Sequence, residues 1–373
     1  MSKVQPTQML IENPTPVERQ TLIPAMLVQG SAEEQQKIDF LLSVSIKQLV
    51  PWRGHSDWTT QDFLRGLWVV RTAVNTTPIA AIWGHPAPGA TALMGKPVSL
   101  ISGPNGLDVD STPLDLELQC QLVAKAMDWA KTVECEMLQA VVEPCDDDFS
   151  TALKQNGLQK LVDLVYLASP NLAEPNGLAH RRPQPQTSGS YSAHSARSSR
   201  FAVVPPHEGN LQRWYRLLES TYEESRDCPA INGRRSLANT VAGYMDSGTY
   251  WENGWVIVQE SDPQTSTKLP SLTFGPSGNS SSGTDLGGFI LADHPSSDFM
   301  ELIYFGISPG ARGQGWGIRI LNEASRLAQQ IGRSRIITAV DRENLPALRV
   351  YAAADYTALE EKAVFARFFP FET

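Results

Sequence analysis

Apolar and polar positions along the C-terminal part of the chain switch between a period of two and a period near 3.6, which predicts strands interleaved with helices. The helix period covers residues 211–226, 236–248, 317–332 and 344–355. The strand pattern covers residues 201–206, 255–260, 287–293, 299–308, 334–341 and 361–369. This order predicts an α/β fold, a mixed sheet with a strand–helix–strand crossover.

The N-terminal half repeats part of this order. LQAVVEPCDDDFSTALKQNG (138–157) parallels ITAVDRENLPALRVYAAAD (337–355), and Ala140 lies 199 positions before Ala339. Further pairs are 163–168 with 362–367, 114–132 with the helix 317–332, and 68–84 with the central hairpin. A shared register over several elements favours a duplication. The alternative is a chance match between two α/β domains of equal size.

Two segments of low complexity interrupt the pattern. Residues 169–200 are rich in Pro, Ser, Gly and Arg and have no apolar period, which is typical of a flexible linker. The expected domains are therefore 1–168 and 201–373. Residues 261–285 lie between two strand-like runs, and we expect a long disordered hairpin loop there.

Composition narrows the class of protein. The chain has 373 residues, of which 41% are hydrophobic and 19% charged, as in soluble globular proteins. A net charge of −9 and a pI near 5.3 argue against a general nucleic-acid binder. The N-terminus lacks an apolar signal core, and no uncharged apolar run is long enough to span a bilayer. We expect a cytoplasmic protein without nucleic-acid or membrane partners.

The four cysteines give no sign of a metal or disulfide framework. None forms a CxxC pair, and no histidine stands at zinc-ligand spacing from them. They are Cys120, Cys135, Cys145 and Cys228. We expect reduced thiols and no bound metal.

Three glycines stand where the strand 299–308 passes into the helix 317–332. Gly313, Gly315 and Gly317 lie in ISPGARGQGWGIRIL. The first turn of a helix has unpaired amides and partial positive charge, and glycines let an anion approach the backbone closely. Arg312 adds a positive charge at the mouth of this turn. The pattern predicts a site for a phosphate or pyrophosphate.

Common phosphate motifs fit this loop poorly. A Walker loop needs Lys and Ser or Thr after its last glycine, whereas Ile318 and Arg319 follow Gly317. A dinucleotide fold needs GxGxxG and an acidic residue at the ribose distance, for which only Asp341 is available. A tight strand–helix turn with no ligand remains the alternative.

The loop and a second motif together resemble the GNAT (Gcn5-related) N-acetyltransferase superfamily. Arg312-x-x-Gly315-x-Gly317 is similar to that family's coenzyme A pyrophosphate loop, and N-x-x-A-x-x-V-Y, from Asn344 to Tyr351, is similar to its second signature. The resemblance covers residues 201 to 369. One departure is Asp355-Tyr356, where the family commonly has Gly-Phe.

The resemblance implies two tandem GNAT-like domains, each a mostly antiparallel mixed sheet flanked by helices. The tandem arrangement is also similar to that of mycothiol synthase, a double acetyltransferase. The N-terminal copy is expected to be degenerate, because GPNGLDVDS (103–111) lacks the glycine motif and Ala152 stands at the place of Tyr351.

The resemblance further implies acetyl-CoA as co-substrate and no metal. Residues 312–317 would hold its pyrophosphate on their amides, and its pantetheine arm would lie along the strand that ends at Ile307. The implied cofactor-binding residues are Ile307, Arg312, Gly313, Gln314, Gly315, Trp316, Gly317 and Asn344.

The implied reaction is transfer of the acetyl group to a primary amine by direct attack in a ternary complex. Glu301, six residues before Ile307, is the candidate base, with Asp298 as a substitute; a surface or ion-paired glutamate is the alternative. Tyr351 is the candidate acid for the departing thiolate, and a core tyrosine is the alternative. Two other functions stay open, a non-catalytic acyl-CoA-binding or scaffold protein and a nucleotide-binding module.

In this family the first two helices and the loop between them select the acceptor. Here that region is TYEESRDCPAINGRR (221–235). The candidate acceptor-binding residues are Tyr222, Asp227, Cys228 and Asn232, on a loop that also carries Glu224 and Arg234. An ordinary polar surface is the alternative. The acceptor would be a small-molecule or peptide amine, and the oligomeric state is not predicted.

Overall fold

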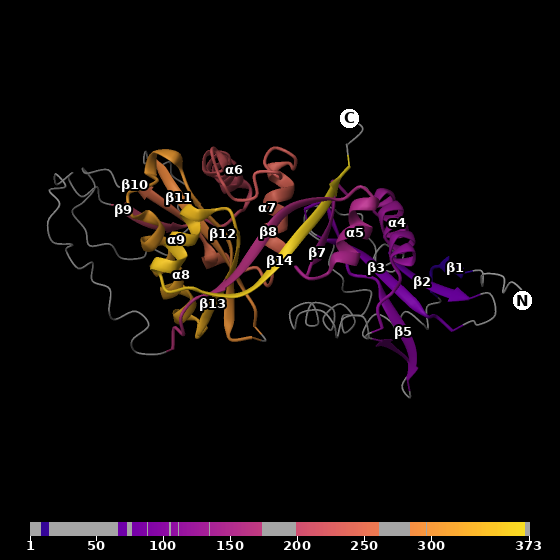
Figure 1. The fold of residues 1–373 in the computed structure, drawn as a ribbon. Coiled ribbons are helices and arrows are strands. Elements are labelled where there is room, and N and C mark those ends of the chain that lie inside the picture. Colours follow the sequence, from indigo (N-terminus) through magenta and orange to yellow (C-terminus); the bar gives the residue numbers. More distant parts are fainter. Residues whose placement is uncertain are drawn as a thin grey trace, which may run out of the picture. The chain divides into compact units, whose positions relative to one another are not determined.

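The computed structural model describes residues 9–14, 66–72, 77–87, 89–103, 106–110, 112–133, 135–173, 199–260, 284–295 and 297–369. The chain forms two compact units (Figure 1). Unit 1 consists of Met1–Val162 and Lys362–Thr373, and unit 2 of Asp163–Glu361. Most of the predicted linker 169–200 and of the predicted loop 261–285 lies outside the described residues.

Unit 2 is a mixed sheet with helices on both faces. Its helices are α6 (Glu208–Tyr222), α7 (Leu237–Asp246), α8 (Trp316–Gln330) and α9 (Leu345–Ala353). Its strands are β9 (Ser199–Val203), β10 (Trp255–Glu260), β11 (Asp285–Asp293), β12 (Phe299–Ile307), β13 (Arg335–Asp341) and most of β8 (Gln159–Ala168). The order is β9-β10-β11-β12-β13-β8, antiparallel except for β12 and β13.

Two apolar cores cover the two faces of this sheet. Val256 and Val258 of β10 pack with α8 and α9, whereas Trp255 and Ile257 of the same strand pack with α6 and α7. Successive side chains of a strand point to opposite faces, so a strand covered on both sides is apolar throughout. This explains why WVIVQE lacks the alternation of a half-exposed strand.

Strands β12 and β13 separate soon after they meet. They pair only from Phe299 with Arg335 to Glu301 with Ile337. Beyond that point the Thr338 hydroxyl donates to the Leu302 carbonyl at 2.9 Å, and a bulge at Ile303 shifts the register of β12 against β11. Bulges bend a strand and re-aim its side chains. The separation leaves one edge of β12 without a strand partner from residue 303 onward, among the described residues.

Unit 1 repeats the second part of this plan. It contains β1 (Met9–Glu12), β2 (Leu67–Thr72), β3 (Ala80–Ala87), β4 (Thr91–Met94), β5 (Val98–Gly103), β6 (Gly106–Asp110), α4 (Leu116–Thr132), β7 (Met137–Val142) and α5 (Asp147–Gln155). Strand β4 pairs in parallel with β7 over its whole length, as β12 begins to do with β13. The duplicated architecture predicted from the sequence is therefore present, with a β5–β6 hairpin inserted before α4.

The last strand of each half pairs in the sheet of the other unit, so the two units differ from the predicted domains 1–168 and 201–373. β8 follows α5 in the chain, but residues 164–168 pair with β13 of unit 2. β14 (Thr357–Phe368) follows α9, but residues 363–368 pair with β7 of unit 1. Phe365 accordingly lies in the core of unit 1, and Val165 and Leu167 lie in that of unit 2. Because the two strands have similar apolar patterns, the sequence alone does not say which sheet each completes.

This exchange yields a stability prediction. Phe365 is 2% exposed in the core of unit 1. Phe365→Ala should cost about 3–5 kcal/mol, and hydrogen exchange should rise in β7, more than 200 positions away in sequence. Leu359→Ala, in the same strand at a side chain 53% exposed, is the matched control and should change stability by less than about 0.5 kcal/mol. Protection of β7 unchanged in Phe365→Ala would contradict the exchanged arrangement.

Candidate functional site

The glycine loop ends in an uncapped helix. After β12 comes a 3-10 turn at Pro309–Ala311, and Gly313 and Gly315 adopt left-handed conformations with φ of +73° and +79°. Gly315 is the N-cap of α8 and supplies no side-chain hydrogen bond, whereas α4, α5, α7 and α9 each begin with a capping side chain. Among the described helices α6 also lacks one. The first-turn amides of α8 therefore stay available to an external acceptor.

Glycine is needed at these three positions for different physical reasons. A Cβ on Gly313 or Gly315 would meet nothing within 4 Å, so these two positions need glycine for their backbone conformation and lie against open space. A Cβ on Gly317 would lie 2.7 Å from Cγ1 of Val350. Gly317 thus lets α8 pack closely against α9. The predicted role in anion approach fits the first two glycines, and Gly317 serves helix packing.

Arg312 is placed differently from the expectation of a charge at the mouth of the turn. Its guanidinium donates to the carbonyls of Ile307 (3.1 Å), Thr221 (3.0 Å) and Glu223 (2.7 Å). A cation at these carbonyls also favours the C-terminal end of α6. Arg312 therefore joins the glycine loop to the end of α6.

Two further loop residues have side chains used within the protein. The Gln314 amide donates to the Gly310 carbonyl at 2.7 Å. Trp316 is 6% exposed in the core, with the Arg319 guanidinium 4.1 Å from its ring centroid. Gln314 and Trp316 would therefore contact a ligand of the loop through their backbone amides.

Glu301 and Tyr351 meet the separating strands from opposite faces of the sheet. Glu301 is the last residue of β12 that pairs with β13. Its neighbours Met300 and Leu302 pack in the core that contains Tyr351, so Glu301 points to the face of α6 and α7. Tyr351, on α9, hydrogen-bonds Thr338, the first residue of β13 beyond the paired segment. The two candidate acid–base residues thus lie on opposite faces of the sheet, each near the point where β12 and β13 separate.

The surroundings of Tyr351 keep its phenol protonated. The residue is 4% exposed, and its ring packs against Phe305 and Tyr356 with centroids 5.9 and 5.2 Å away. Burial raises the pKa of Tyr351, and the charge of Asp227 acts in the same direction. A protonated phenol can donate a proton or a hydrogen bond and cannot act as a base at neutral pH. This agrees with the predicted acid role.

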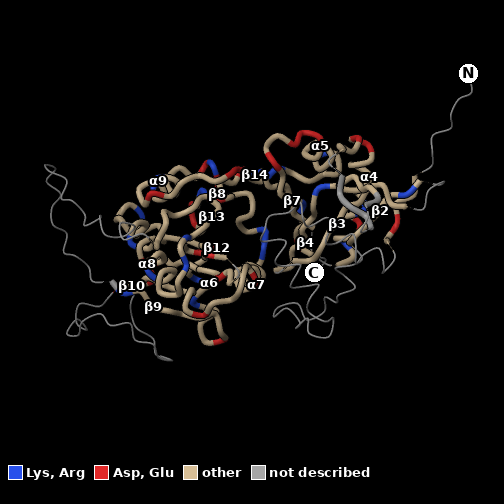
Figure 2. Tube along the Cα trace, turned by 90° about the horizontal axis from the view of Figure 1, so that it is seen from below, with Lys and Arg blue, Asp and Glu red and all other residues tan. Residues whose placement is uncertain are grey.

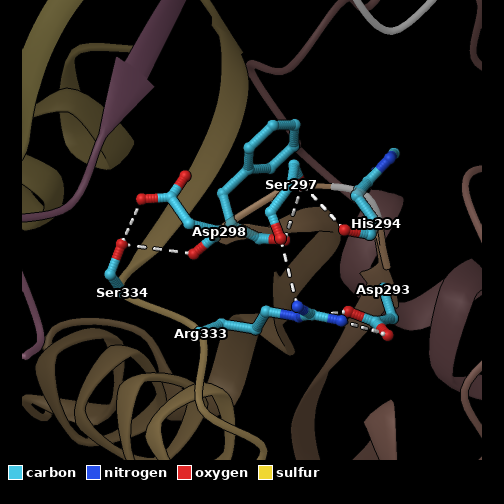
Figure 3. Close-up of polar contacts among 7 residues, drawn as sticks. Asp293, His294, Ser297, Asp298, Arg333 and Ser334 are labelled. Atoms are coloured by element: carbon cyan, nitrogen blue, oxygen red, sulfur yellow. Dashed lines mark hydrogen bonds and ion pairs between the residues drawn. The ribbon is translucent and has the colours of Figure 1, made fainter. Parts of the chain in front are cut away.

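The structure gives Glu301 a partner that the sequence did not indicate. Glu301 Oε2 lies 3.2 Å from Nε2 of His294, a ring only 5% exposed. His294 follows β11 directly, and neither a motif nor a helical spacing connects it to Glu301 in the sequence. The substitute base, Asp298, instead accepts a hydrogen bond from the Ser334 hydroxyl (Figure 3).

The predicted acceptor loop is held against β13. The backbone N–H of Cys228 donates to Oδ2 of Asp341 at 3.0 Å, and that of Asp341 donates to Oδ1 of Asp227 at 3.2 Å. Burial, followed by the charges of Asp227 and Asp341, raises the pKa of the Cys228 thiol to about 12. A thiol held protonated is a poor nucleophile. Cys228 is therefore unsuited to form an acyl-enzyme.

Of the other predicted residues, Tyr222 and Asn344 have side chains that make hydrogen bonds within the protein, whereas Asn232 lies apart from the rest. The Tyr222 hydroxyl lies 2.6 Å from that of Tyr244, on the face of α6 and α7. Asn344 caps α9 by accepting from Ala347 N–H at 3.3 Å and also hydrogen-bonds Asp227, so its side chain is engaged on the acceptor-loop side. Asn232 lies exposed in a turn of the loop and is not brought to the other residues.

The corresponding helix of unit 1, α4, begins with a capping side chain. The Asp115 carboxylate accepts from Leu118 N–H at 2.9 Å and so fills the N-terminal end of α4. Acidic residues also gather at the start of α5, the counterpart of α9 (Figure 2). Carboxylates at these helix ends compete with a phosphate and repel it. The degenerate character predicted for the N-terminal copy fits these contacts.

Comparison with known proteins identifies the fold. A model of the acetyltransferase (GNAT) family matches residues 277–356. The chain is similar to the structure of a GCN5-related N-acetyltransferase from Sphaerobacter thermophilus, with 13% identity, a TM-score of 0.56, and coverage of 96% of this chain and 95% of the other. It is also similar to the glucosamine N-acetyltransferase region of a fungal multi-domain GH3 β-N-acetylglucosaminidase, with 12% identity and a TM-score of 0.54, covering 98% of this chain and 38% of the other.

A tandem GNAT protein from the clavulanic acid biosynthesis pathway aligns with 98% of this chain and 99% of its own, at 15% identity and a TM-score of 0.48. No curated protein sequence gives a significant match. The family match and the fold confirm the resemblance to the GNAT superfamily.

Within the described residues, no cluster of His, Cys, Asp and Glu has the arrangement of a metal site. No helix in that part of the chain is both long and apolar enough to cross a membrane.

Asp246, at the end of α7, yields a pH-dependent prediction. Burial raises its pKa from an unperturbed 3.8 to about 6. Because the folded protein prefers the protonated carboxyl, the stability contribution is full below the unfolded pKa and is lost as the pH rises through about 6. Asp246→Asn should therefore raise the free energy of unfolding at pH 7.5 by up to about 1 kcal/mol after solvent screening is allowed for, which is measured as a higher Tm, and the gain should be smaller at pH 5. An equal gain at both pH values would contradict the effect of burial.

Proposed function

We propose that unit 2 transfers an acetyl group from acetyl-CoA to a primary amine. The proposal starts from a GNAT acetyltransferase fold in which an uncapped helix follows one of two separating strands. The observation that carries the proposal is the joint placement of three features. They are the uncapped start of α8 after Gly313 and Gly315, the unpaired edge of β12, and the position of Glu301 and Tyr351 beside the point where β12 leaves β13.

The residues of the loop fit a pyrophosphate. The left-handed glycines present bare backbone to open space, and the first-turn amides of α8 point along a helix dipole that favours anions. The unpaired edge of β12 carries backbone groups suited to the amides of a pantetheine arm. Acetyl-CoA combines both parts and supplies an activated acetyl thioester. Its reactive end would then lie near the point where β12 leaves β13, beside Glu301 and Tyr351.

Each side chain has one task in this scheme. Glu301 takes a proton from the acceptor amine, whose nitrogen must be neutral to attack the thioester carbonyl. Tyr351 gives a proton to the sulfur as the carbon–sulfur bond breaks, which suits a phenol that burial keeps protonated. The acceptor approaches from the face of α6 and α7, where the loop of residues 223–236 is held by Arg312 and Asp341. Since Cys228 stays protonated, the amine attacks directly.

Calorimetry with acetyl-CoA tests the loop. Gly315→Glu should abolish binding, because a carboxylate would occupy the anion site. The matched control is Gly332→Glu at the other end of α8, since Gly332 has the same φ of +79° and also faces open space. Wild type and the control should bind with a stoichiometry near one, because the counterpart helix in unit 1 is closed by Asp115. Unimpaired binding by Gly315→Glu would remove the loop from the cofactor site.

Release of coenzyme A thiol with an amine panel tests the chemistry. Tyr351→Phe should lower kcat by about tenfold or more and leave the Kd for acetyl-CoA unchanged. The neighbouring Tyr356→Phe is the matched control, because its hydroxyl is buried with no hydrogen-bond partner in the described structure. It should leave kcat unchanged. Equal kcat in Tyr351→Phe and wild type would exclude the acid role, and acetyl-CoA binding without transfer to any amine would favour a non-catalytic acyl-CoA-binding protein.

A further inference from the structure

His294 is a buried ring placed directly against the candidate base. Its Nε2 lies 3.2 Å from Oε2 of Glu301, and its ring stacks on Phe299 with centroids 4.9 Å apart. Gly248, just after α7, covers the ring nitrogen so closely that a Cβ there would lie 2.9 Å from Nε2. The space around Nε2 is thus shaped to hold the imidazole against Glu301.

A network of polar contacts fixes the turn that carries His294. Arg333 pairs with both carboxylate oxygens of Asp293 at 2.7 and 3.0 Å and donates to the Ser297 carbonyl at 3.0 Å (Figure 3). The hydroxyl and the backbone N–H of Ser297 each donate to the His294 carbonyl at 2.8 Å. A bidentate ion pair fixes the relative orientation of the guanidinium and the carboxylate. The β11–β12 turn is therefore held at both sides of His294.

The other charged groups near this ring are occupied or lie on neighbouring elements. Asp293 is paired with Arg333, and Asp298 accepts from Ser334. On α7 the titratable groups are Tyr244 and Asp246, and Glu252 lies in the turn before β10. Glu301 is the acidic side chain that the ring contacts within ion-pair distance. The contact therefore singles out Glu301 as the group on which His294 acts.

We propose that His294 is a positioning residue for Glu301, donating its Nε2–H to Oε2 and leaving Oε1 to accept the amine proton. This inference rests on the proposed function and adds a residue and a tautomer to it. The donated hydrogen bond restricts rotation of the carboxylate and holds its free oxygen on the face of α6 and α7, from which the acceptor would approach. When Oε1 takes the proton from the amine, the Nε2–H bond stays in place. The ring itself neither gains nor loses a proton in the transfer step.

A double-mutant cycle separates this role from a structural one. His294→Phe keeps the ring volume but removes the donor, and it should lower kcat/KM for the amine by about tenfold to a hundredfold with an unchanged Kd for acetyl-CoA. His294→Gln, whose amide can replace Nε2–H, should recover most of the activity. Glu301→Gln should alter the pH–rate profile, and adding His294→Phe to it should cost little more, because the two residues act as a unit. Asp246→Asn is the control for a nearby titratable group and should leave the activity unchanged.

The tautomer gives a readout that does not depend on turnover. Ring ¹⁵N shifts of His294 in wild type at pH 8 should report the Nε2–H form. An Nδ1–H form, equal losses from His294→Phe in the wild-type and Glu301→Gln backgrounds, or unchanged kcat/KM in His294→Phe would each overturn the inference. A wild-type protein that binds acetyl-CoA but acetylates no amine would instead overturn the proposed function. An active wild type whose kcat/KM is unchanged by His294→Phe would overturn this inference alone.

Discussion

The separation of β12 from β13 is the constraint on which the rest of unit 2 depends. Their parallel ladder ends at Glu301 and Ile337 because each strand is held on its other side, β12 by β11 and β13 by β8. The bulge at Ile303 bends one strand away, and the Thr338 hydroxyl satisfies the carbonyl of Leu302 at the point of departure. Beyond this point one edge of β12 has no strand partner among the described residues, and Tyr351 hydrogen-bonds Thr338 at the same place.

The sheet of unit 2 contains strands from both halves of the sequence. β13 pairs with residues 164–168 of β8, so the N-terminal half supplies the strand that holds β13 in place. In return, the end of β14 completes the sheet of unit 1, where Phe365 joins the core. The last strand of the N-terminal half therefore has a structural role in unit 2, whose sheet it completes.

The two units share a strand–helix–strand–helix segment but differ at the start of its first helix. In unit 2 the helix after the central strand starts at a bare glycine, and in unit 1 it starts at Asp115, whose carboxylate occupies the first-turn amides. One capping side chain thus decides whether the first-turn amides of the helix are occupied or available to an external acceptor. The network of Arg333, Asp293 and Ser297 has a comparable role at the opposite end of β12, where it fixes the turn beside Glu301.

The local elements and the motif of the site could be predicted from the amino-acid sequence alone. Apolar periods placed the strands and helices of unit 2, and the glycines with Asn344 and Tyr351 pointed to the family, because backbone conformation and helix caps depend on near neighbours. Only the tertiary structure decided which sheet β8 and β14 complete, that Arg312 binds carbonyls of α6, and that His294 contacts Glu301. Strands with similar apolar patterns fit either edge, and a long side chain reaches its partner only once distant elements have packed, so no spacing along the chain encodes these contacts.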